Sequence, residues 1–259
     1  MVELNKLLKS KQYIFANGCS HTAGAEMEFS SQNTCYEKAW PAVMAKHLDK
    51  ESINLAVSGG SSKRIVRTTM LYFGNYPQRL KDSFVIIGWP GPHRSEIRVG
   101  HKVNTNIPKE VTKDTDDEHW FFMAPGNNES FKKRMKQGNI DKNLFNYYRM
   151  YYALTTERQF WIDYFVHLIS LQNYLKALQV PYLFYNATST LHVDNIYHNL
   201  RQQIDTRHWV GNVHTHEDSY ARQTQAAGFD YPEWSLTNHY GEDGHAWWAE
   251  RLISYIANP

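Results

Sequence analysis

The sequence predicts an α/β fold of three layers, helix on sheet on helix, around a mostly parallel sheet of about five strands. Two observations lead to this prediction. Short apolar runs without polar alternation, typical of buried parallel strands, recur at 13–16, 52–57, 83–88 and 181–186. Between them lie longer stretches whose apolar residues follow helical spacing. Strands that alternate with helices favour a parallel sheet covered on both faces.

The first strand, Tyr13–Ala16, breaks abruptly into the small and polar residues of the stretch 17–24. Gly18 permits a positive φ or a close backbone approach. Ser20 then lies at the carboxyl end of a central strand, where open α/β sheets bind their ligands. Two interpretations of Ser20 stay open at this point. It is either a nucleophile or the cap of the following helix.

The next elements repeat the pattern of strand, small-residue turn and helix. The spacing predicts helices over 36–48 and from about 62 to 72. The strand at 52–57 ends in Ser58-Gly59-Gly60-Ser61-Ser62. The strand at 83–88 ends in Trp89-Pro90-Gly91-Pro92-His93-Arg94. Each strand therefore ends in residues that form tight turns.

The second half of the chain is less regular. Residues 95–140 are polar and mixed in charge, which predicts an insertion with little regular structure, either a solvated loop or a lid. A long helical stretch over 141–178, the strand at 181–186 and a last helix from about 243 to 257 follow. Residues 187–238 give no clear assignment. We expect residues 1–259 to form a single domain.

Composition narrows the classes of function. The formal net charge is +2 and no long basic tract occurs, so we expect no nucleic-acid partner. No apolar run approaches the ~20 residues that span a bilayer, and we expect no membrane partner. Two cysteines, Cys19 and Cys35, and an N-terminus without a secretory signal favour a cytoplasmic protein. His214 and His216 resemble a metal pair without a third ligand, so a polar loop is preferred and no metal or cofactor is expected.

Four blocks together resemble the SGNH (GDSL-type) hydrolase family. The segment Gly18-Cys19-Ser20-His21-Thr22-Ala23-Gly24 matches its first block at the glycines, the serine and the threonine, with Cys19 in place of the aspartate. Asn54 to Gly59 matches the second block, and the turn after strand 83–88 has the position of the third. In the stretch 239–249, His239 stands shortly before a Gly-His-x-x-Trp-Ala helix, as the catalytic histidine of the family does.

The resemblance implies a flavodoxin-like SGNH-hydrolase fold and a serine esterase. Ser20 would attack an acyl carbonyl, and His239 would act as general base and then as general acid. The backbone N–H groups of Ser20 and Gly59 would bind the oxyanion. The implied substrate is a small-molecule or glycan ester, and an acetyl ester on a sugar is the narrower option. His245 is interpreted as a supporting or helix histidine.

Two departures from the family pattern support an alternative. Pro90 occupies the position of the asparagine that donates to the oxyanion, and proline has neither a side-chain donor nor a backbone N–H. Loss of one such donor costs roughly two to three orders of magnitude in rate. The family aspartate would fall at Leu236 or Thr237. The alternative is therefore an SGNH-like binding or structural module that has lost efficient hydrolysis.

Three further residues are predicted to bind substrate. Trp89 and Arg94 follow the third strand, and either side chain offers a donor that could replace the lost asparagine. Arg94 is also suited to an anionic group on the substrate. Asn186, at the end of the fourth strand, is the third candidate, although asparagine at such a position often only starts a turn. The oligomeric state is left open.

Overall fold

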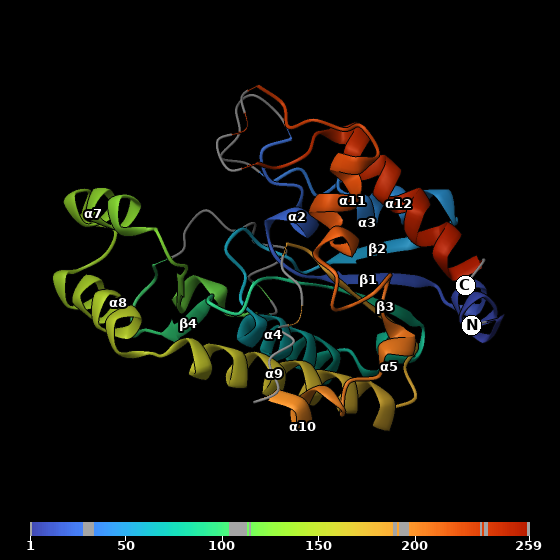
Figure 1. Cartoon of the computed structure of the whole chain (residues 1–259), viewed down its shortest axis with the longest axis horizontal. Coiled ribbons are helices and arrows are strands. Elements are labelled where there is room, and N and C mark those ends of the chain that lie inside the picture. The colour runs from blue at the N-terminus through green and yellow to red at the C-terminus, as the bar shows by residue number, and fades with distance from the viewer. Residues whose placement is uncertain are drawn as a thin grey trace.

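The centre of the molecule is a parallel sheet of four strands in the order β2-β1-β3-β6 (Figure 1). These strands are β1 (Tyr13–Asn17), β2 (Glu51–Asn54), β3 (Ser83–Trp89) and β6 (Tyr182–Asn186). An isolated parallel bridge from Phe184 to Trp209 lies beside β6. The computed structural model describes residues 2–27, 34–103, 113, 115–188, 191, 197–233, 235 and 238–257.

Helices cover both faces of the sheet, because successive strand residues point to opposite sides. Phe15, Val85 and Ile87 pack on one face against α4 (Ser62–Asn75) and α9 (Glu157–Ala177). The residues between them pack on the other face against α1 (Val2–Ser10), α3 (Trp40–His47) and α12 (Glu242–Ala257). Figure 1 shows α4 and α9 on one side of the strands and α3 and α12 on the other. The predicted three-layer α/β fold is confirmed, with four strands in the described sheet instead of about five.

Capping residues explain why the stretch predicted as one helix over 141–178 is two. Helix α8 (Lys142–Leu154) begins after Asp141, whose side chain accepts from the backbone N–H of Leu144 at 2.7 Å. Helix α9 begins after Thr156, whose hydroxyl accepts from the N–H of Gln159 at 3.2 Å. Such side-chain caps satisfy N–H groups at a helix start and fix where it begins.

Short helices fill the remaining connections between the main elements. The segment 187–238, which the sequence left unassigned, contains most of them. They are α5 (Pro77–Lys81), α10 (His198–Arg201), η3 (Thr206–His208), η4 (His216–Asp218) and α11 (Tyr220–Ala226).

The prediction that residues 95–140 have little regular structure is wrong. The segment contains an antiparallel hairpin and two helical segments, which lie to one side of the sheet in Figure 1. Phe121, Phe131 and Tyr148 contribute to a separate apolar cluster that joins the hairpin to α7 and α8. The apolar residues are too widely spaced along the chain for a period to stand out. The elements are β4 (Ser95–Arg98), η1 (Asp117–His119), β5 (Trp120–Met123) and α7 (Asn128–Lys136).

A buried group of ion pairs attaches this insertion to the main domain. Arg67 of α4 donates to Glu96 and to Asp117 at 2.8 Å each, and Arg64 also pairs with Asp117. The side chains of Arg64 and Asp117 have no exposed surface. Burial alone raises the pKa of Asp117, but the two guanidinium groups bring it below its usual value. Arg64 also donates to Asn17 at 3.3 Å, so the network reaches the carboxyl end of β1.

None of the described helices combines the length and the apolar character that crossing a membrane requires.

Candidate active site

The turn after β1 positions Ser20, and this turn requires glycine at positions 18 and 24. A Cβ on Gly18 would lie 2.4 Å from Oγ1 of Thr22 and 3.0 Å from the carbonyl oxygen of Gly88 in β3. Ser20 is the first residue of the short helix α2 (Ser20–Ala23). Gly24 ends that helix with a φ of +76°, and its N–H donates to the carbonyl of Ser20. The chain therefore makes a tight turn at the carboxyl ends of β1 and β3.

Ser20 has two groups that are available for a ligand. Its hydroxyl has no hydrogen-bond partner among the described residues, and the residue is only 4% exposed. Its backbone N–H, at the start of α2, has no acceptor there either. The same holds for the N–H of Gly59, in a turn with a φ of +78°. That these two amides point into one pocket stays a prediction.

His239 is held by a carboxylate that the sequence did not indicate. Nδ1 of His239 lies 3.0 Å from Oε2 of Glu26, in the turn that follows α2. Both side chains are mostly buried, with 8% and 12% exposed. The hydroxyl of Ser235 donates to the same Oε2 at 2.8 Å and accepts from the backbone N–H of His239 at 2.8 Å. Because a carboxylate accepts, the pair favours the tautomer with the proton on Nδ1 and the lone pair on Nε2.

The backbone on both sides of this contact has an uncommon conformation. Glu26 has a φ of +60°, and Asn238, directly before His239, also has a φ of +60°. Side chains other than glycine rarely take positive φ, and such residues cluster at functional sites. Reasoning from the sequence missed Glu26 because the family pattern places the acid only two or three residues before His239. The signal was an acidic residue three positions after the end of the Ser20 helix.

Two further buried histidines, His21 and His245, belong to the same part of the structure. The ring of His21 is 4.7 Å from that of His239, centroid to centroid. The side chain of His245 accepts from the backbone N–H of Trp40 at 3.1 Å, as expected of a supporting histidine. Burial, with the nearby histidines, lowers the pKa of His21 well below its usual value and that of His245 to about 3. The lowered pKa values of these two neighbours favour their neutral imidazole forms. His21 was missed as a site residue, although it directly follows Ser20.

The pKa of His239 reflects opposing influences. Burial lowers it, the hydrogen bond and negative charge of Glu26 raise it, and the positive charge of Arg94 lowers it, with a net decrease. Arg94 acts on His21 in the same direction. The structure thus brings together His239, Glu26 and His21 at the helix that carries Ser20, and Arg94 lies in the segment that follows β3. No hydrogen bond joins Ser20 to His239 in the described part of the chain, so their direct contact stays a prediction.

The other predicted substrate-binding residues are placed differently. Trp89 is fully buried and packs edge-on against Tyr164 and Phe184 in the core. Its indole N–H has no acceptor among the described residues, and its contact with substrate stays a prediction. Asn186 is 2% exposed and donates to the carbonyl of Val213 at 2.9 Å. Its side-chain oxygen has no hydrogen-bond partner among the residues that the structure describes.

Two more expectations from the sequence concern the acid and a metal. Leu236 and Thr237, where the family aspartate would fall, lie outside the described residues.

Within the described ranges, the group with metal-ligand geometry is Asp116, Glu118 and His119, not the pair at 214 and 216. Asp116 already contacts Arg98 and His119, and Glu118 contacts Lys102. All three side chains of the group are therefore already engaged in ion pairs.

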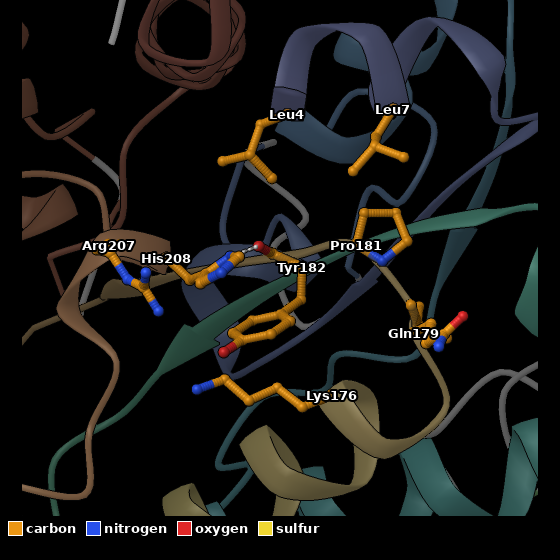
Figure 2. A pocket seen from close by; sticks show the side chains of 9 residues that line it. Leu4, Leu7, Lys176, Gln179, Pro181, Tyr182, Arg207 and His208 are labelled. Atoms are coloured by element: carbon orange, nitrogen blue, oxygen red, sulfur yellow. Dashed lines mark hydrogen bonds between the residues drawn. The ribbon is translucent and has the colours of Figure 1, made fainter. Parts of the chain in front are cut away.

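A cavity of about 310 Å³ lies at the opposite end of the strands (Figure 2). Tyr182, the first residue of β6, lines it, and its ring stacks on His208 at 4.3 Å between centroids. Leu4 and Leu7 of α1 form its apolar wall. Ser20 and Asn17 belong to the carboxyl ends of the strands, so this cavity is separate from the candidate site.

Comparison with known proteins places the chain in a family. Residues 30–258 match the model of a family described as "Family of unknown function (DUF6071)". The chain belongs to this family. The match includes Arg94 and His239 but begins after Ser20 and Glu26. None of the curated proteins compared with this DUF6071 member matches it.

Solved structures provide distant likenesses of this DUF6071 chain. A protein assigned to the lipolytic G-D-S-L family of Desulfitobacterium hafniense DCB-2 is 12% identical, with a TM-score of 0.47 over 95% of this chain and 99% of that one. TesA is 10% identical, with a TM-score of 0.47 over 94% and 97%. A carbohydrate esterase with catalytic and non-catalytic binding functions is 15% identical, with a TM-score of 0.43 over 96% and 65%. At these values the likeness assigns no activity, which must follow from the residues of the chain.

Proposed function

We propose that the protein is a serine hydrolase that cleaves esters, with Ser20 as nucleophile, His239 as base and Glu26 as the residue that orients His239. The observation that carries the proposal is the buried hydrogen bond between His239 and Glu26, made beside the helix that begins with Ser20. A serine hydroxyl becomes a good nucleophile only when a base takes its proton. A carboxylate on Nδ1 favours the tautomer in which Nε2 holds the lone pair that such a base needs.

The reaction follows from these groups. The oxygen of Ser20 attacks the ester carbonyl carbon while its proton passes to Nε2 of His239. The carbonyl oxygen becomes negative, and the N–H groups of Ser20 and Gly59 stabilise it. When the tetrahedral intermediate collapses, the alcohol leaves with the proton from His239 and the acyl group stays on Ser20. Water, deprotonated by His239, then attacks the acyl carbon; the bond to the oxygen of Ser20 breaks, His239 returns the proton to that oxygen, and the acid is released.

The proposal adds the identity of the acid to the Ser–His pair. Glu26 supplies the negative charge that the sequence could not find at 236 or 237. It stabilises the imidazolium that forms when His239 takes the proton, in surroundings where little solvent screens the interaction. The acyl group and the alcohol remain open, and an acetyl ester on a sugar is the narrower candidate. The cytoplasmic location inferred from the sequence belongs to the same proposal.

A catalytically weakened binding module is the second candidate. Pro90, which is buried at the end of β3, takes the place of an oxyanion donor. The hydroxyl of Ser20 also has no partner among the described residues. Catalytic hydrogen bonds are often loose without substrate, so this arrangement alone does not decide between the two candidates.

Turnover of 4-nitrophenyl acetate tests the hydrolase proposal. We expect slow but measurable hydrolysis by the wild-type protein, since the proposed oxyanion site has the N–H groups of Ser20 and Gly59 but lacks an asparagine donor. Ser20→Ala and His239→Ala should each reduce the rate to that of buffer, with the melting temperature of each variant checked to exclude misfolding. Equal rates for the wild-type protein and Ser20→Ala would favour the binding module.

A further inference from the structure

Arg94 is a cation at the edge of the candidate site, and it has no partner among the described residues. It lies between β3 and β4, and its side chain is only partly exposed. Nη1 is buried and has no hydrogen-bond acceptor within the described ranges. No acidic side chain in the described part of the chain forms an ion pair with Arg94. A guanidinium has five N–H donors and stays charged, so it is costly to bury without an acceptor.

The basic residues near Arg94 have acidic partners, so the lack of one among the described residues is particular to Arg94. His93, one residue earlier, already pairs with Glu157 through a 2.6 Å contact. The hydroxyl of Tyr152 donates to the backbone carbonyl of His93 at 2.7 Å, which fixes the segment. Arg98 in the next strand pairs with Asp116 at 3.1 Å. The basic residues on both sides therefore have acidic partners, and Arg94 is held in place without one among the described residues.

Arg94 lies on the same side of the sheet edge as the candidate nucleophile. It follows the carboxyl end of β3, against which the turn of Gly18 and Ser20 packs. Its positive charge also contributes to the lowered pKa of His21 and His239. The carboxylate of this cluster, Glu26, is bound to His239. An unneutralised cation opposes the positive charge that a base acquires when it takes a proton. A bound anion would remove this obstacle.

We propose that Arg94 binds an anionic oxygen group, a carboxylate or a phosphate, on the molecule that occupies the site. The planar fork of a guanidinium matches both groups through paired hydrogen bonds. The proposal rests on the function proposed above and names its substrate class as anionic esters. A neutralised Arg94 would also let His239 take the proton of Ser20 more easily. Substrate charge would thereby promote both binding and chemistry.

Binding is measured without turnover by using the Ser20→Ala variant. Calorimetric titration with benzoate and with inorganic phosphate shows which anion is preferred, and neutral benzamide is the control ligand. We expect at least one anion to bind and benzamide not to bind. Adding Arg94→Met should weaken anion binding by about tenfold to a hundredfold, the range for hydrogen bonds to charged groups. Adding Arg98→Met, the matched change at a paired and exposed arginine, should have no effect.

Kinetics distinguish this inference from the hydrolase proposal. The matched substrates are 4-acetoxybenzoate and its neutral amide, 4-acetoxybenzamide. We expect kcat/KM to favour the anionic ester by about tenfold or more, and Arg94→Met, but not Arg98→Met, to abolish the preference. Arg94→Lys, which keeps the charge without the fork, should retain part of it.

Two results would overturn the anion site. One is that neither benzoate nor phosphate binds, and the other is that Arg94→Met binds them as tightly as the parent while its melting temperature is unchanged. If anions bind through Arg94 but neither ester is hydrolysed, the hydrolase function fails and the anion site stands. If both esters are hydrolysed equally well and no anion binds, the hydrolase stands and the anion site fails.

Discussion

Replacing Glu26 by glutamine tests whether the charge of Glu26 supports His239, because glutamine has nearly the same shape. The amide has the size of the carboxylate, so Ser235 keeps a partner. It removes the negative charge from Nδ1 of His239, at a position where the two side chains are only 8% and 12% exposed. Solvent screens the interaction poorly there. The amide also offers an N–H₂ donor, which favours the imidazole tautomer with its lone pair on the wrong nitrogen.

The expected loss in kcat is on the order of 10³- to 10⁴-fold, the scale known for neutralising the acid of a serine triad. That corresponds to about 4–5.5 kcal/mol of transition-state stabilisation. KM should change little, because Glu26 contacts His239 and not the substrate in this scheme. Initial rates with 4-nitrophenyl acetate give both constants. Glu37→Gln, an exposed glutamate in the turn before α3, is the matched control and should leave them unchanged.

The pH profile separates orientation of His239 from general damage. His239 must be neutral to act as base, so kcat/KM falls as pH drops through its pKa. Burial places that pKa below its usual value in the wild-type protein, although Glu26 raises it. Removing the negative charge lowers it further, so the acid limb of Glu26→Gln moves to lower pH. An unmoved limb, or a loss in kcat below tenfold, would refute the role assigned to Glu26.

Two further predictions concern stability. Asp117→Ala leaves Arg64 and Arg67 without their shared carboxylate and should lower the free energy of unfolding by about 3–5 kcal/mol. Urea denaturation measures this free energy. A loss under 1 kcal/mol would contradict the stabilising role of the buried network. Burial lowers the pKa of His245 in the folded protein to about 3, so as the pH falls the unfolded chain binds a proton at this residue first. The free energy of unfolding should therefore decrease below pH ~6.5, by up to about 1.36 kcal/mol per pH unit from this group. A smaller pH dependence in His245→Gln is the expected result, and an unchanged one would contradict it.

The sheet could be predicted from the sequence because each strand has its own local pattern. Uninterrupted apolar runs mark buried parallel strands, and glycines mark the turns after β1 and β2. Phe15, Val85 and Ile87 alternate with residues of the opposite face, and this alternation fixes both helical layers. The hairpin at 95–123 lacked such a pattern. Its strands have four residues each, and its core is shared with α8, far along the chain.

The site was predictable only in part, because its contacts are made across long sequence separations. Ser20 and His239 could be named from motifs, since each stands in a local pattern of glycines and apolar residues. Glu26 lies 213 positions before His239, and no local pattern connects the two. Arg94 could be named as an anion-binding candidate, but the burial of its Nη1 without an acceptor among the described residues is visible only in the structure. Trp89 could likewise be named from its place after the third strand, but its full burial is visible only in the structure.

Labelling with a fluorophosphonate probe tests the central claim most directly. The probe phosphorylates a serine only when a base activates it, so it reports the joint action of Ser20 and His239. The account predicts one adduct, located by mass spectrometry on the peptide that contains Ser20. It also predicts no labelling of folded Ser20→Ala and much slower labelling of folded Glu26→Gln. A wild-type protein that stays unlabelled, or an adduct on another serine, would contradict the claim.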